Sequence, residues 1–316
     1  MFIKKDLRKI PVIFSDAAEE SKREEGQQMK DLRLARRPAE FKGSIAPLCQ
    51  PVYVPSLQAI TSLSLYDCQI SNLDSVNFLA SSCSQLEELN LGRNPLKHIP
   101  EDVANFPSLK SLWLDDCLIE GPIPTCLYAL EKLEVLRISN NFITEIDEKQ
   151  VAKWKNMQLL CLDGNLIESI PQALDQLTKL QKLLLRKNKI KKLPEGVPGS
   201  SHEDLTLFHI SSNELEALPS SITKCTSLEI IYANANKIIS VPTDFASLKA
   251  LTHCNFSSNR IEVLDDSFVE RFGSPDANAV CSKDPNVSIR FERNPVLSSE
   301  VRHLSQASDG NDMDIS

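Results

Sequence analysis

The chain has 316 residues, of which 41% are hydrophobic and 25% charged, a composition typical of a folded protein. Its net charge of −8 and isoelectric point of about 5.3 argue against a nucleic-acid-binding protein, which usually carries a basic surface. No stretch reaches the roughly 18 unbroken apolar residues of a membrane-spanning helix, so we expect no transmembrane segment. Charges interrupt the first residues where a secretory signal would be apolar, and we therefore expect a cytoplasmic protein, with the nucleus as the alternative compartment.

Residues 1–56 contain only fragments of the pattern that dominates the rest of the chain. Segments 7–14 and 29–34 resemble the closing half and a decayed strand of that pattern, and residues 17–30 between them are charged and favour a helix. We expect 1–56 to form an N-terminal cap or flanking segment. A disordered tail is the alternative.

From residue 57 to residue 297, the pattern L-x-x-L-x-L-x-x-N-x-L recurs about ten times. The asparagine slot, here called the anchor position, recurs every 23 to 26 residues until a last gap of 35. Many near-periodic copies of one pattern indicate a repeat protein. The anchors are Cys68, Asn94, Cys117, Asn141, Asn165, Asn188, Asn213, Asn236, Asn259 and Asn294.

This pattern resembles the leucine-rich-repeat superfamily. The second half of many copies, as at Ile99-Pro100, resembles the intracellular, Ras-suppressor-like group, whereas residues 121–124 (GPIP) resemble the plant-type repeat. The resemblance implies an α/β fold, a leucine-rich-repeat solenoid or horseshoe with a concave parallel sheet of short strands. We expect the solenoid to cover 57–297, with a disordered acidic tail over 298–316.

The last repeat contains an insertion, because its anchor gap is twelve residues longer than the usual 23. The extra residues are rich in Gly, Pro, Ser, Asn and Asp, which predicts a loop near 265–286.

The pattern also predicts what each position does. In a strand, successive side chains point to opposite faces, so the leucines of L-x-L should be buried and the x residues should line the concave face. An anchor asparagine can bond the backbone with both its amide donor and its acceptor. Cys68 and Cys117 do this less well, so we expect looser turns there, and we interpret both as substitutes in the anchor slot rather than nucleophiles or metal ligands.

The sequence contains no GxSxG, GxxxxGK, HExxH or CxxC motif, and its five histidines show no metal-ligand spacing. We therefore predict a chain that is not an enzyme, with no cofactor, no metal and no small-molecule substrate. Nine cysteines without pairing motifs indicate free thiols in a reducing compartment.

We predict a partner-binding track among the residues that should line the concave face. Trp113 is its clearest member, because Trp, Tyr and Arg are enriched at binding hot spots. The alternative is that Trp113 only packs on neighbouring strands. The candidate residues are Tyr66, Trp113, Asp115, Arg137, Asp163, Arg186, His209 and Tyr232.

A basic cluster stands out against the acidic total. It could contact an acidic protein segment or an acidic membrane surface, and nucleic acid less readily; the alternative is a solvated edge of one coil. Its lysines are Lys179, Lys182, Lys187, Lys189, Lys191 and Lys192.

The resemblance implies a protein-interaction adaptor or scaffold in intracellular signalling, with a protein partner. We expect the chain to be a monomer. Two alternatives remain open: a regulatory subunit of an enzyme such as a protein phosphatase, and a substrate-recognition component of ubiquitin signalling.

Overall fold

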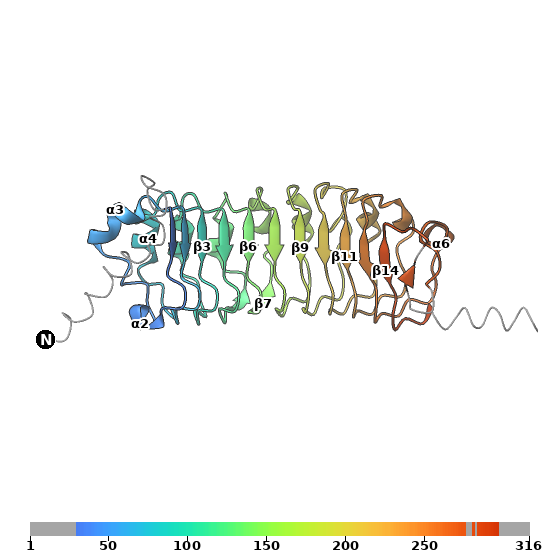
Figure 1. Cartoon of the computed structure of the whole chain (residues 1–316), viewed down its shortest axis with the longest axis horizontal. Coiled ribbons are helices and arrows are strands. Elements are labelled where there is room, and N and C mark those ends of the chain that lie inside the picture. The colour runs from blue at the N-terminus through green and yellow to red at the C-terminus, as the bar shows by residue number, and fades with distance from the viewer. Residues whose placement is uncertain (1–29, 276–279, 282, 297–316) are drawn as a thin grey trace, which may run out of the picture. The chain divides into compact units, whose positions relative to one another are not determined.

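The computed structural model describes residues 30–275, 280–281 and 283–296. The chain forms two compact units, Met1–Leu166 (unit 1) and Ile167–Ser316 (unit 2). Each unit is a series of coils, and each coil contributes one short strand, a turn at the anchor position and a return segment (Figure 1). The repeats therefore form the leucine-rich-repeat architecture that the sequence predicts.

Unit 1 contains a parallel sheet of six three-residue strands in constant register, so that Leu63, Leu89 and Leu112 lie side by side. All three are buried. In spatial order the strands are β1 (Asp31–Arg33), β2 (Ser62–Ser64), β3 (Glu88–Asn90), β4 (Ser111–Trp113), β6 (Val135–Arg137) and β8 (Leu159–Cys161).

Unit 2 repeats this arrangement with five parallel strands and adds one antiparallel strand at the end of its sheet. Its central residues Leu183, Phe208 and Ile231 pair in register and are buried. In spatial order the strands are β9 (Lys182–Leu184), β10 (Leu207–His209), β11 (Ile230–Tyr232), β12 (His253–Asn255), β14 (Ser288–Arg290) and β13 (Val280–Cys281).

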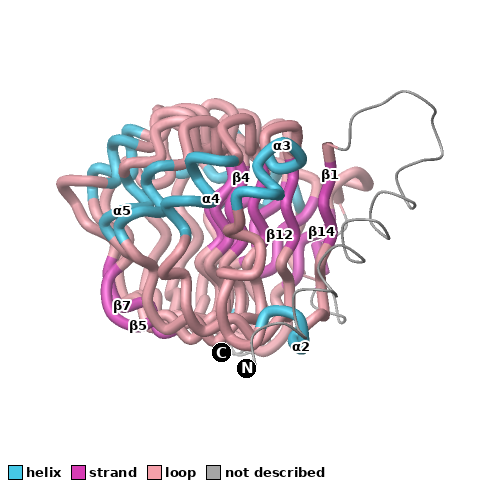
Figure 2. The backbone as a smooth tube through the Cα atoms, turned by 90° about the vertical axis from the view of Figure 1, so that its left-hand side faces the viewer, coloured by secondary structure: helices cyan, strands magenta, loops and turns pink. Residues whose placement is uncertain are grey.

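The return segments carry short helical turns on the side of each coil away from its strand (Figure 2). Pro100, Pro171 and Pro219 each precede a 3-10 turn, so the second half of these repeats begins with a short helical turn. The turns in unit 1 are α2 (Pro38–Phe41), η1 (Pro51–Tyr53), α3 (Val54–Leu57), α4 (Val76–Ser82), η2 (Glu101–Asn105), α5 (Thr125–Tyr128) and η3 (Val151–Lys153). Those in unit 2 are η4 (Gln172–Gln176), η5 (Ser220–Lys224), η6 (Phe245–Ser247) and α6 (Asp266–Phe272).

The anchor asparagines connect neighbouring coils through their side-chain amides. Asn141, which is 4% exposed, accepts hydrogen bonds from the backbone N–H groups of Cys117 (3.1 Å) and Ile119 (2.9 Å) in the preceding coil. Its Nδ2 donates to the carbonyls of Leu114 (2.8 Å) and Ile138 (3.1 Å). One buried side chain thus bonds backbone groups of two successive coils, including two N–H groups of the preceding coil.

The two cysteine anchors produce a different turn. Cys68 and Cys117 donate through Sγ to the carbonyls of Leu34 (3.0 Å) and Leu91 (3.3 Å). The residues directly after them, Gln69 and Leu118, adopt left-handed backbone conformations with φ of 56° and 60°. The turns at the two cysteines thus differ from the asparagine turns in backbone conformation, while the expected looseness stays a prediction.

The plant-type segment forms a second, two-stranded parallel sheet in unit 1. Its strands are β5 (Glu120–Pro122) and β7 (Phe142–Glu145). On the same side of these coils, the buried rings of Tyr128 and Trp154 stack with centroids 4.5 Å apart, and Trp154 Nε1 donates to the carbonyl of Leu127 at 2.9 Å.

Two predicted boundaries look different in the structure. Of the expected cap over 1–56, residues 1–29 lie outside the described residues, while β1 pairs in parallel with β2 and so continues the repeat sheet. The predicted loop near 265–286 contains α6 and β13. The expected acidic tail over 298–316 lies outside the described residues.

Helix α6 forms because its sequence is locally amphipathic. The carboxylate of Asp265 accepts a hydrogen bond from the N–H of Phe268 (2.7 Å), which caps the first turn. Phe268 and Phe272, four residues apart, share one face and are buried, and the Phe268 ring lies 5.7 Å from that of Phe291. The helix therefore covers apolar side chains of the last coils of unit 2.

Removing one anchor amide should destabilise the fold measurably. Asn141→Ala leaves the N–H groups of Cys117 and Ile119 buried without their acceptor, and we expect a loss of about 3 kcal/mol in the free energy of unfolding. Asn105→Ala, which removes only exposed side-chain hydrogen bonds, is the control and should change it by less than about 0.5 kcal/mol. Equal stabilities of the two variants in urea denaturation would contradict the role of the anchor.

Candidate functional site

The outward side chains of the strands form one continuous surface in each unit, here called the strand face. Trp113 lies on the strand face of unit 1 between Asn90 of β3 and Arg137 of β6, which are its neighbours in register. It is half-buried, and no aromatic ring among the described residues stacks on it. The indole thus rests on the sheet with part of its surface open to solvent.

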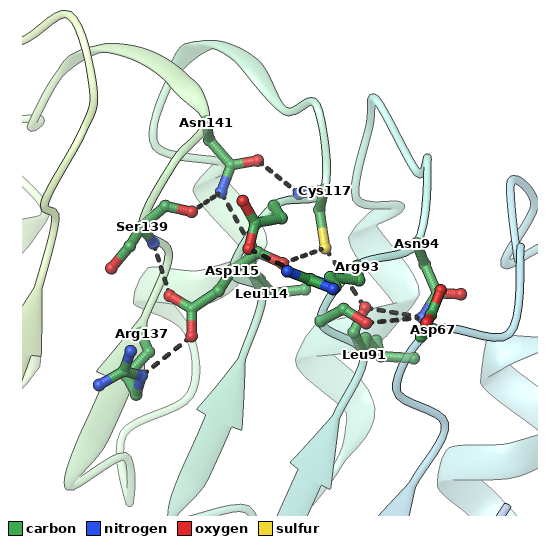
Figure 3. A network of polar contacts seen from close by, with 12 residues as sticks. Asp67, Leu91, Arg93, Asn94, Leu114, Asp115, Cys117, Arg137, Ser139 and Asn141 are labelled. Atoms are coloured by element: carbon green, nitrogen blue, oxygen red, sulfur yellow. Dashed lines mark hydrogen bonds and ion pairs between the residues drawn. The ribbon is translucent and has the colours of Figure 1, made fainter. Parts of the chain in front are cut away.

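An ion pair follows Trp113 on the same face. Asp115 accepts a hydrogen bond from Nε of Arg137 at 2.9 Å and a second from the backbone N–H of Ser139 at 2.8 Å (Figure 3). The Asp115 side chain is 19% exposed and that of Arg137 38%. Two hydrogen bonds to one carboxylate orient the guanidinium beside the indole before any partner arrives.

The remaining predicted residues of unit 1 lie further along the same face. Tyr66 follows β2, and the guanidinium of Arg93 lies 5.9 Å from the centre of its ring. Gly92 is buried beside this ring, where an added Cβ would approach the tyrosine to 3.2 Å. Asp163 follows β8 and is half-buried. Tyr66, Asp163 and the Asp115–Arg137 pair therefore share a face without forming one compact cluster.

In unit 2, the structure brings His209 and Tyr232 into contact. Their rings meet edge to face with centroids 5.1 Å apart. Burial, together with the positive charge of Arg186, lowers the pKa of His209 to about 4. This histidine is therefore neutral at pH 7, and the positive charge of this part of the face comes from Arg186.

Both strand faces are more apolar than the predicted track suggested. Four half-buried aliphatic side chains occupy the first outward position of their strands, one residue before the buried central residue. Because outward and inward side chains alternate along a strand, the sequence alone could have identified this position as outward-facing. These residues are Val135, Leu159, Leu207 and Ile230.

A hollow of about 340 Å³ opens on the strand face of unit 2, between β11 and β14. Arg290 is exposed on its rim, and it forms no ion pair with any residue that the structure describes. The hollow is lined by Tyr232, His253, Cys254, Asn255, Ser288 and Arg290.

The lysines of the predicted basic cluster are all exposed, but they do not share one surface. Lys182 belongs to the strand face, in β9. Lys187 adopts a left-handed conformation in the turn before its anchor, where φ is 53°. Lys191 and Lys192 line a groove of about 550 Å³, together with Leu218 and Ile239 among others. Lys179 and Lys189 lie outside the strands.

The thiols are unsuited to nucleophilic chemistry. None of the nine cysteines forms a disulfide, and eight of them are buried. Burial raises the pKa of Cys117 to about 12 and that of Cys49 to about 11, so both are protonated at pH 7. These values favour the structural interpretation of the cysteine anchors.

The described residues show neither a metal-binding cluster nor a membrane-spanning helix. No three His, Cys, Asp or Glu side chains among them lie close enough to hold a metal ion. None of their helices has the length and apolar character needed to cross a membrane.

Comparisons with known proteins agree with the repeat pattern. A family profile described as "Leucine rich repeat" matches residues 131–190, and a second with the same description matches 85–106 and 108–130. A disease resistance protein of Arabidopsis thaliana, RPS4B, is 29% identical over 144 residues, which cover 42% of this chain and 12% of that protein. The chain thus spans about an eighth of the length of this relative.

Solved structures share the fold at low sequence identity. An LRR protein of Leptospira interrogans superimposes with a TM-score of 0.67 at 20% identity, over 78% of this chain and 59% of that one. The LRR ectodomain of the receptor kinase GASSHO1/SCHENGEN3 from Arabidopsis thaliana, solved in complex with Casparian strip integrity factor 2, gives 0.63 at 23% identity, over 82% and 31%. At these identities the likeness establishes the architecture alone.

The neutral state of His209 predicts an acid-sensitive fold. The unfolded chain binds a proton near pH 6.5, whereas His209 in the folded chain does so only near pH 4, so stability should fall as the pH drops from 6.5 towards 4. Buried His202 acts in the same direction, because burial lowers its pKa too. His209→Gln should therefore lose less stability than the wild type over this range in urea denaturation. Exposed His253→Gln is the matched control, and an unchanged pH profile in His209→Gln would contradict the assignment.

Proposed function

Because the chain belongs to the leucine-rich-repeat superfamily, we propose that it is a non-catalytic adaptor or scaffold that binds another protein on its strand faces. The observation that carries this proposal is the half-buried indole of Trp113 beside the Asp115–Arg137 ion pair. The few side chains that dominate the binding energy of protein interfaces are enriched in Trp, Tyr and Arg. Here the ion pair already holds Arg137, so less conformational entropy is lost on binding.

We further propose that this binding serves signalling in the cytoplasm. The relative with 29% identity is a disease resistance protein, and one structural neighbour was solved in complex with an integrity factor, which supports a recognition role for the shared architecture. Nine cysteines without a disulfide support a reducing compartment. The activities of those much longer proteins do not transfer, since this chain spans only a part of each.

Trp113→Ala should weaken partner capture with little loss of stability. The indole packs on the sheet surface, and its removal should cost about 1 kcal/mol of unfolding free energy. If Trp113 is a binding hot spot, capture should fall at least tenfold, since such side chains contribute about 2 kcal/mol or more. Quantitative affinity purification with mass spectrometry, from a lysate of the source organism, measures the retention of each partner.

Phe142→Ala is the matched control for that experiment. Phe142 is an aromatic residue with 45% exposure, but it lies on β7 of the second sheet, away from the strand face. This variant should retain the partners of the wild type. Retention of every partner by Trp113→Ala would contradict the proposed binding face.

A further inference from the structure

The charges on the two strand faces are arranged differently. In unit 1, the cations of β1 and β6 have carboxylate partners: Arg33 pairs with Asp31 at 2.7 Å and Arg137 with Asp115 at 2.9 Å. In unit 2, Lys182 and Arg290 are exposed and pair with none of the described carboxylates. None of the ten outward residues within its five parallel strands is acidic.

The strand registers place these cations at opposite ends of two rows. The first row across β9, β10, β11, β12 and β14 runs Lys182, Leu207, Ile230, His253, Ser288. The second runs Leu184, His209, Tyr232, Asn255, Arg290. Aliphatic and aromatic side chains thus occupy the middle of a face with a cation at each end. Arg186 follows β9 at the first end, whereas Glu292, which accepts a hydrogen bond from Ser257 Oγ, follows β14 at the other.

From this arrangement we infer that the strand face of unit 2 binds an extended acidic peptide segment. The segment carries one acidic residue at each end of an apolar stretch. The inference rests on the proposed function and names its partner chemistry. Five strands at a spacing of about 4.8 Å separate the two basic ends by roughly 19 Å. An extended chain rises about 3.3 Å per residue, so the two acidic residues lie about six positions apart.

Each end of the face offers a distinct contact. At β14, Arg290 stands on the rim of the 340 Å³ hollow, which has room for one carboxylate side chain. The Asn255 Oδ1 in this hollow already accepts the N–H of Ser257 at 2.9 Å, so its amide offers the Nδ2 donor to a ligand. At β9, Lys182 supplies a mobile ammonium group. Between them, Leu207, Ile230 and Tyr232 cover the apolar residues of the peptide.

The test is selection of a random peptide display library on the immobilised full chain, followed by sequencing. We expect enrichment of peptides with two Asp or Glu residues about six positions apart and apolar residues between them. The double variant Lys182→Glu with Arg290→Glu should reduce the affinity of the best selected peptide at least tenfold in fluorescence anisotropy. Lys224→Glu with Lys249→Glu makes the same change in net charge at exposed positions away from the strands and should stay within twofold.

Other results would overturn the inference without touching the proposed function. The selected peptides could lack an acidic bias and lose binding in Tyr232→Ala. This face would then bind peptides, but without a preference for acidic residues. Co-sedimentation with phosphatidylcholine–phosphatidylserine vesicles that depends on Lys182 and Arg290, with no peptide enriched, would replace the peptide by a membrane. If neither acidic peptides nor the vesicles bind, this face has no anionic ligand. The Trp113 experiment tests the proposed function in either case.

Discussion

The buried amide of the anchor asparagine is the interaction on which the rest of the structure depends. A coil that leaves its strand exposes backbone N–H and C=O groups to an apolar interior, and these groups must find partners. Asn94 supplies them for Cys68, Ile70, Leu65 and Leu91, all at 2.8 to 3.0 Å. Because each amide bonds the preceding coil as well as its own, it fixes the path of one coil relative to the next within a unit.

Constant register between strands follows from this constraint. Once successive coils are fixed, their central residues fall side by side, as Leu136 and Leu160 do, and the outward residues form straight rows. Rows of side chains at a regular spacing of about 4.8 Å are a preformed surface for an extended ligand or a flat partner. A surface that needs no rearrangement loses less entropy on binding, which is why this architecture suits recognition.

The fold could be predicted almost completely from the sequence, because the buried positions and the anchors repeat. What the sequence did not reveal depends on contacts between residues far apart in the chain. Helix α6 was missed because the Gly- and Pro-rich residues after it suggested a loop, although Asp265 and Phe268 carried a helix signal. Leu207 and Ile230 were overlooked since only later outward positions were considered. The pairing of Asp115 with Arg137, 22 residues apart, becomes visible only when the coils are stacked.

Specificity in such a protein resides in side chains that contribute little to its core. Arg137 and Arg290 occupy equivalent outward positions on strands with the same backbone, yet the first has an internal carboxylate partner and the second has none among the described residues. An internally paired cation is partly neutralised before a ligand arrives, while an unpaired one retains its attraction for an external anion. Two faces built on one repeat can therefore differ in what they bind, because the anchor amides and buried leucines hold the backbone regardless of which residues point outward.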